Sequence, residues 1–238
     1  MRELNELIDV DDPAWPALRK EFAGASVPVE VLPGDADRGR ACPLQLQVNA
    51  ASFLGALVLH SGGLLLDHGW LRVYGGGCRD LPGPAAVNHF PAGFDPVWRP
   101  LDGLVIGHDA LGGVFALNLH DPAAAGRPGA PGQVVYFAPD SLAWEPLEIG
   151  YATWVTWLLS GRLDQFYDGL RWPGRQTESA GLGPGQGIAV YPFLWSEEAR
   201  ADLAATTRHP VSLRELLGIS ADSCRQLGLR DPGFLGAV

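Results

Sequence analysis

Two Asp/His pairs contain the residue types in this sequence that could do chemistry together. Asp67 and His68 are consecutive in LLLDHGWLRVY, and His108 and Asp109 are consecutive in LVIGHDALGGVF. A carboxylate beside an imidazole could serve general acid–base catalysis or metal binding if the two segments converged. Asp, His and Gly are also ordinary turn residues, and we expect the turn role at both places.

The sequence lacks the other common patterns of catalytic and cofactor sites. It has no HExxH pair, no carboxylate-rich cation loop and no GxSxG serine turn. The glycine-rich segments 75–77 and 183–187 lack both the GK[ST] ending of a phosphate loop and GxGxxG spacing. Cys42, Cys78 and Cys224 are far apart and form no CxxC pair. We therefore predict no catalytic residue, no metal site and no cofactor.

The charge balance excludes some classes of partner. The 238 residues include 27 acidic and 17 basic ones, which gives a formal net charge of −10. Lys20 is the only lysine and no basic cluster is present, so we expect no nucleic-acid partner. No apolar run approaches the roughly 20 residues that span a bilayer, so we expect no membrane insertion. The absence of a signal-like N-terminus and the odd cysteine count predict a cytoplasmic location.

An acidic surface is the candidate binding site. Turns at one edge of a sheet can share a surface, and several charged or aromatic residues fall at predicted turns and strand ends. These candidates are Asp67, His68, Trp70, Asp109, Asp140 and Glu145. Such a surface would speed association with a basic protein partner and make binding sensitive to salt. The alternative is that the acidic residues are spread evenly and serve solubility.

The segment from Leu104 to Leu159 positions most of these candidates and predicts two β-hairpins followed by a helix. Each hairpin has apolar runs on both sides of a turn, at 108–113 and at 139–141. Directly afterwards, YATWVTWLLSG places Trp154 and Trp157 at helical spacing. We expect an antiparallel meander with this helix packed across it and both tryptophans buried.

Further elements are expected on either side of this segment. Helices are predicted at 4–8, 15–22, 163–170 and 197–205, at 35–42 with a stop at Pro43, and after a capping box formed by Ser212 and Glu215. The apolar segment 53–60 favours a short helix, with a strand as the alternative. An edge strand is predicted at 27–33, a hairpin around 67–70, a proline-rich loop at 81–100 and a flexible glycine-rich loop at 177–187.

These elements predict the α+β class. We expect an antiparallel or mixed sheet with helices packed on one face and a C-terminal helical segment. The length favours a single domain over residues 1–218, followed by a loosely attached tail over residues 219–238.

Several segments, in order along the chain, match the signature blocks of a bacterial family. They are LLLDHGWLRVYGGG, VIGHDALGGVFALN, VVYFAPDSLAWEPLEIGY, LLSGRLDQFYDGLRWPG and YPFLWS. By these blocks the chain resembles the uncharacterised family DUF2625, from about Leu4 to about Leu217. It departs from the family pattern at 185–187, where an acidic residue precedes Gln in the family, and at Arg175, where the family has an aromatic residue.

The middle of the chain also resembles the SUKH superfamily. The matching elements are Asp109–Leu117, Val134–Phe137, Trp144-Glu145 and Tyr151–Leu159. This resemblance implies a SUKH-like α+β core and a binding role, because many SUKH proteins are immunity proteins that neutralise toxins and others are adaptors. It implies no catalytic residue.

The leading hypothesis is therefore a non-enzymatic cytoplasmic protein-binding domain of the immunity or adaptor type, with a basic toxin or adaptor target as its partner. The alternative is a small-molecule-binding protein or enzyme with a pocket near Asp67, His68, Trp70 and Asp109. A third possibility is self-association through the apolar segment Ile188–Trp195. The sequence leaves the oligomeric state open.

Overall fold

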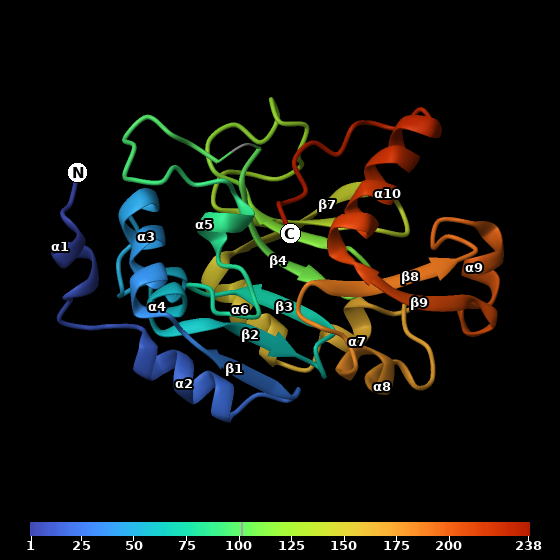
Figure 1. Cartoon of the computed structure of the whole chain (residues 1–238), viewed down its shortest axis with the longest axis horizontal. Helices are drawn as coiled ribbons and strands as arrows, with labels where there is room; N and C mark the ends of the chain where they lie inside the picture. Colours follow the sequence, from blue (N-terminus) through green and yellow to red (C-terminus); the bar gives the residue numbers. More distant parts are fainter. Residues whose placement is uncertain (101) are drawn as a thin grey trace.

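A seven-stranded antiparallel sheet forms the centre of the computed structural model, which describes residues 1–100 and 102–238 (Figure 1). Each strand pairs with its neighbours in sequence. The strands are β1 (Val29–Pro33), β2 (Ser61–Leu66), β3 (Leu71–Tyr74), β4 (Leu104–Asp109), β5 (Val114–Leu117), β6 (Gln133–Ala138) and β7 (Ala143–Gly150). A separate antiparallel pair consists of β8 (Gln186–Tyr191) and β9 (Thr207–Ser212). The predicted α+β class and antiparallel meander are confirmed.

Helices precede, follow and interrupt the sheet. They are α1 (Leu4–Ile8), α2 (Trp15–Ala23), α3 (Ala36–Leu46), α4 (Phe53–His60), α5 (Pro84–Val87), α6 (Tyr151–Leu159), α7 (Leu163–Phe166), α8 (Arg175–Ala180), α9 (Glu197–Ala201) and α10 (Leu213–Gln226), with a 3-10 turn at Leu203–Ala205. The predicted cap of α10 is present, because the Ser212 hydroxyl accepts a hydrogen bond from the Glu215 amide at 3.2 Å.

The first face of the sheet, which carries Leu66, Ile106 and Phe115, packs against α2, α4 and α6. Trp154 of α6 is fully buried there, with its ring centroid 5.3 Å from that of Phe115. The helix that follows the two hairpins thus covers the sheet, as its spacing predicts. Trp157 is only half-buried and packs at its edge against Phe166.

The second face of the sheet, which carries Tyr74, Val114 and Phe137, is covered by α10 and by the last residues of the chain. Figure 1 shows the C-terminus over the middle of this sheet. Three polar side chains bind carbonyl groups of the terminal segment. They are Trp144 to Pro232 at 2.8 Å, Arg127 to Phe234 at 3.0 Å and His108 to Leu235 at 2.8 Å.

The end of the chain therefore differs from the predicted loose tail. Residues 219–226 continue α10, and residues 232–235 are tied to the sheet by hydrogen bonds. Apolar contacts reinforce this attachment, since Cys224 and Leu235 are buried in the core of the second face. The last segment contains glycines and a proline, which are typical of loops, so its sequence does not predict this attachment.

Several other segments differ from their predictions. The helix predicted at 197–205 is interrupted at Asp202, between α9 and the 3-10 turn. Helix α3 continues through Pro43 to Leu46, and Gln47 closes it in the left-handed conformation with φ 54°. The helix predicted at 163–170 is a single turn that ends at Phe166, and Gly169 further along has a left-handed φ of 80°. The predicted glycine-rich loop at 177–187 begins inside α8 and ends in β8.

Candidate functional site

The carboxylate of Asp109 is fully buried and saturated with hydrogen bonds. Its Oδ1 accepts the amides of Leu111 and Gly113, each at 2.8 Å, and closes the turn between β4 and β5. Its Oδ2 accepts the hydroxyls of Tyr136 at 2.7 Å and Tyr167 at 3.1 Å. Burial raises the pKa of Asp109, and these hydrogen bonds oppose the rise. The arrangement leaves no lone pair open to a substrate, so Asp109 holds the turn and the segment after α7.

Asp67 is neutralised by two arginines that come from the segment after α7. Its Oδ2 accepts Arg171 Nη2 at 2.7 Å and Arg175 Nη1 at 3.0 Å. Both guanidinium groups also lie over the ring of Trp70, at 5.6 and 5.5 Å from its centroid. Asp67 and His68 adopt left-handed φ angles of 50° and 60° in the turn between β2 and β3. The pairs thus attach α8 to this tight turn.

The structure brings three of the six predicted site residues together, but inside the protein. Tyr167 connects them, since its hydroxyl bonds Asp109 and its ring lies 5.6 Å from that of Trp70. Asp67, Trp70 and Asp109 are at most 4% exposed, so they form no binding surface. His68 is exposed beside this cluster.

The remaining two candidates lie on the second central hairpin. Asp140 is half-buried, and its backbone carbonyl accepts Arg200 Nη2 at 3.0 Å. Glu145 is exposed and accepts the Ser141 hydroxyl at 3.1 Å. The prediction of one acidic face that includes Asp67 and Asp109 is therefore wrong. Those two carboxylates are used internally to satisfy amides, hydroxyls and arginines.

His108 and Asp109 do not form an acid–base pair, because consecutive strand residues point to opposite faces. His108 lies on the second face, where Nδ1 is 2.6 Å from the Tyr74 hydroxyl and Nε2 is 2.8 Å from the Leu235 carbonyl. Burial lowers the pKa of His108 to about 4. Within the described part of the chain, no group of three or more His, Cys, Asp or Glu could hold a metal ion.

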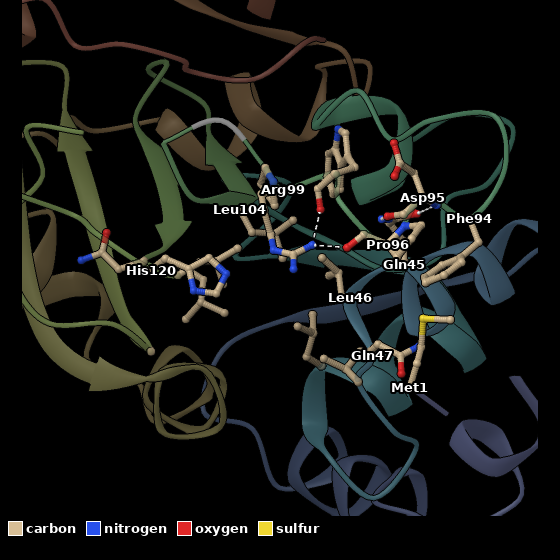
Figure 2. Close-up of a pocket in the computed structure, with 18 residues that line it drawn as sticks. Met1, Gln45, Leu46, Gln47, Phe94, Asp95, Pro96, Arg99, Leu104 and His120 are labelled. Atoms are coloured by element: carbon tan, nitrogen blue, oxygen red, sulfur yellow. Dashed lines mark hydrogen bonds between the residues drawn. The ribbon is translucent and has the colours of Figure 1, made fainter. Parts of the chain in front are cut away.

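An open pocket lies elsewhere, between the C-terminal end of α3, the proline-rich loop and the ends of β4 and β5 (Figure 2). Its volume is about 590 Å³. The described lining residues are mostly apolar, and the polar ones include Gln45, Asp95, Arg99, Asn118 and His120. This pocket is distant from the turns that the sequence singled out.

The proline-rich loop is attached to α3 by a reciprocal pair of hydrogen bonds. Gln45 Nε2 donates to the Asp95 carbonyl at 2.7 Å, and Gln45 Oε1 accepts the Asp95 amide at 3.0 Å. The Asp95 carboxylate accepts the Val97 amide at 2.9 Å and so shapes the loop itself. The rings of Phe90 and Trp98 pack 4.6 Å apart. These contacts give the pocket a defined wall.

Arg99 is the charged group that this loop presents to the pocket. Its Nη1 donates to the carbonyls of Pro96 at 2.9 Å and Trp98 at 2.7 Å. Figure 2 shows the guanidinium near the middle of the pocket, with His120 on one side and Leu46 below it. Nε and Nη2 of Arg99 have no hydrogen-bond partner among the residues that the structure describes. Half of the guanidinium therefore remains available.

Reasoning from the sequence missed this pocket because its residues come from separate elements. The sequence predicts only a proline-rich loop at 81–100. An arginine and aromatic side chains in a loop rich in prolines were the signal that could have found it. The contact between this loop and Gln45 spans 50 residues, which no local pattern reveals.

A second exposed feature is an aromatic patch at the end of β8, formed by Tyr191, Phe193 and Trp195. Tyr191 is 65% exposed and Phe193 is 40% exposed. The rings of Phe193 and Trp195 stack with their centroids 4.5 Å apart. The apolar segment Ile188–Trp195 is thus divided. Ile188 and Leu194 are buried, while Tyr191 and Phe193 are exposed.

No described helix is long and apolar enough to cross a membrane. Comparison with known proteins identifies uncharacterised relatives. An Escherichia coli (strain K12) protein described as putative uncharacterized protein YbfG is 40% identical over 219 residues, which cover 91% of this chain and 94% of the relative. An uncharacterized protein of Haemophilus influenzae is 29% identical over 195 residues, which cover 82% of this chain and 83% of the relative.

No solved structure matches the chain. The family model for proteins of unknown function DUF2625 matches residues 4–216, in agreement with the signature blocks. The chain belongs to the DUF2625 family.

Proposed function

We propose that this protein is a non-enzymatic binding protein that holds a small molecule in the pocket beside the proline-rich loop. The observation that carries the proposal is the combination of volume and lining. A pocket of about 590 Å³ lies within the range of small-molecule sites, which are mostly apolar with a few polar groups. Its wall reaches the core, since Leu54 and Leu104 line it and are at most 6% exposed.

The polar groups of the pocket support binding rather than catalysis. General acid–base or nucleophilic chemistry needs a reactive group hydrogen-bonded to its activating partner. Among the described lining residues, the Asp95 carboxylate is bonded to a backbone amide, and His120 has no hydrogen bond to a carboxylate. The sequence predicts a small-molecule pocket near the turns that contain Asp67 and Asp109. We instead assign small-molecule binding to the pocket beside the proline-rich loop.

The test is to fill the pocket and measure what the protein retains. Leu119 lines the pocket and is half-buried, so Leu119→Trp should occupy part of its volume. Purified protein is denatured and extracted, and the extract is compared by mass spectrometry with that of the variant. We expect a small molecule in the wild type that is depleted at least tenfold in the variant.

Leu229→Trp is the matched control, because Leu229 is 45% exposed and does not line the pocket. It should retain the molecule. Melting curves check that both variants fold. Equal retention by all three proteins, or no ligand by extraction and none from a thermal-shift library, would contradict the proposal.

A second candidate function is binding of a basic protein partner in the cytoplasm, as an immunity or adaptor protein would. The aromatic patch favours it, because exposed aromatic residues are enriched at protein interfaces. Glu197 and Glu198 follow the patch after Ser196, and both are exposed. The resemblance to SUKH proteins and the free state of Cys42, Cys78 and Cys224 also support this role and location.

This candidate is tested with two variants and a purified partner. Proteins from a related bacterium are captured at low salt, and a captured basic protein is then purified and titrated against the wild type. Its affinity should fall at least tenfold in Phe193→Ser and decrease with salt in the wild type. Binding unchanged by Phe193→Ser and by Glu198→Lys would reject the patch as the contact surface.

A further inference from the structure

We propose that the ligand of this pocket carries a carboxylate on an apolar body, and that Arg99 binds the carboxylate. The inference rests on the proposed function, since it names the ligand class of that same site. It follows from the geometry of Arg99, from the charges around Arg99 and from the apolar residues that line the pocket.

Arg99 is pre-organised to bind a planar anion. Two backbone carbonyls hold its Nη1, so the guanidinium is fixed relative to the loop. The edge formed by Nε and Nη2 is the one that pairs with a carboxylate through two parallel hydrogen bonds. In the described structure no Asp or Glu forms a salt bridge with Arg99. Arg99 is exposed, so this edge of its guanidinium is open to a ligand carboxylate.

The other charges of the pocket favour a carboxylate over a phosphate or a cation. Arg99 is the one Arg or Lys among the described lining residues, and Asp95 is the one carboxylate. Asp95 already accepts the Val97 amide, so it is less available to a ligand cation. A phosphate monoester carries a charge of about −1.5 to −2, so a single guanidinium leaves part of that charge uncompensated. The single negative charge of one carboxylate is balanced by the single positive charge of Arg99.

The apolar lining of the pocket favours a ligand with an apolar body. The aliphatic lining residues of the pocket are Leu46, Val48, Leu54, Leu104, Leu117 and Leu119. Water in contact with these side chains is released when an apolar ligand replaces it, which favours binding by roughly 25 cal/mol per Å². A molecule without an apolar part would lose this contribution.

The experiment uses probes that share one chain and differ in the head group. Octanoate, 1-octanol, octylammonium and octyl phosphate are titrated calorimetrically into the wild type, Arg99→Gln and Leu119→Trp. We expect octanoate to bind about tenfold more tightly than the other three, as a charge-assisted pair contributes. Arg99→Gln should weaken octanoate about tenfold and change 1-octanol less than twofold.

The outcomes separate this inference from the proposed function. Arg19→Gln removes an equal charge from an exposed position on α2 and should bind like the wild type. If 1-octanol, octylammonium or octyl phosphate binds as tightly as octanoate, or if Arg99→Gln leaves octanoate unchanged, the carboxylate inference is overturned while the pocket stands. If no probe binds the wild type, or if Leu119→Trp binds all of them normally, the pocket itself is rejected.

Discussion

At the scale of single residues, the polar groups of the core have structural roles. Asp109 satisfies two turn amides and two tyrosine hydroxyls, and Asp67 pairs with two arginines. An ionised side chain in the interior is stable only when such partners are present, because burial removes its hydration. The aspartates of the two Asp/His pairs thus fix turns of the sheet, while His108 binds the end of the chain.

Asp109→Ala should destabilise the protein strongly. The substitution leaves the amides of Leu111 and Gly113 and two hydroxyls unpaired in the interior, so we expect a loss of about 3–5 kcal/mol in the free energy of unfolding. Urea unfolding measures the change. Glu145→Ala, which alters an exposed carboxylate, should stay within about 0.5 kcal/mol. Similar stability of the two variants would show that Asp109 is not the structural centre of its turn.

At the scale of elements, local patterns predict the sheet well and the site poorly. The hairpins and α6 follow from apolar runs, turn residues and helical spacing, and all of them are present. Strand β9 was missed because TRHPVS carries a proline and few apolar residues. Pro43 lies inside α3 although it lacks the amide of a regular helix position, and its neighbour Cys42 is buried in the core. The pocket depends on contacts between distant elements, which periodicity does not encode.

Helix α6 provides the test of packing at this scale. Trp154 is fully buried, so Trp154→Ala should cost about 3–5 kcal/mol of unfolding free energy as a large-to-small core change. Trp157 is half-buried, so Trp157→Ala should cost less, about 1–2 kcal/mol. Chemical denaturation gives both values. The reverse order would mean that α6 is rotated about its axis relative to the sheet.

At the scale of the whole molecule, one buried imidazole connects the sheet to the end of the chain. Neutral His108 accepts a hydrogen bond from the Tyr74 hydroxyl at Nδ1 and donates one from Nε2 to the Leu235 carbonyl. Burial lowers its pKa to about 4, and the nearby Arg72 acts in the same direction. Protonation would remove the acceptor at Nδ1 and place a charge beside a buried arginine. The attachment of the last segment is therefore coupled to pH.

This coupling has a definite sign. The pKa of His108 falls from an ordinary value of 6.5 to about 4 on folding, so its contribution is fully present above pH 6.5 and is lost as the pH falls towards 4. The wild type should lose on the order of 3 kcal/mol over that window. His108→Gln should lack this component, and the difference between the two proteins isolates it from the acidic residues. Parallel stability curves would contradict the assignment.

The attachment of the last segment also determines when the second face of the sheet can be covered during synthesis of the chain. The meander pairs each strand with the next one in sequence, so it can assemble progressively as the nascent chain emerges. Its second face cannot close in this way, because the partners of His108 and Arg127 lie 127 and 107 residues further along. Until residues 232–237 have been synthesised, Val87, Val105 and Phe137 remain partly uncovered. A translating chain that stalls late thus exposes a hydrophobic surface that chaperones can bind.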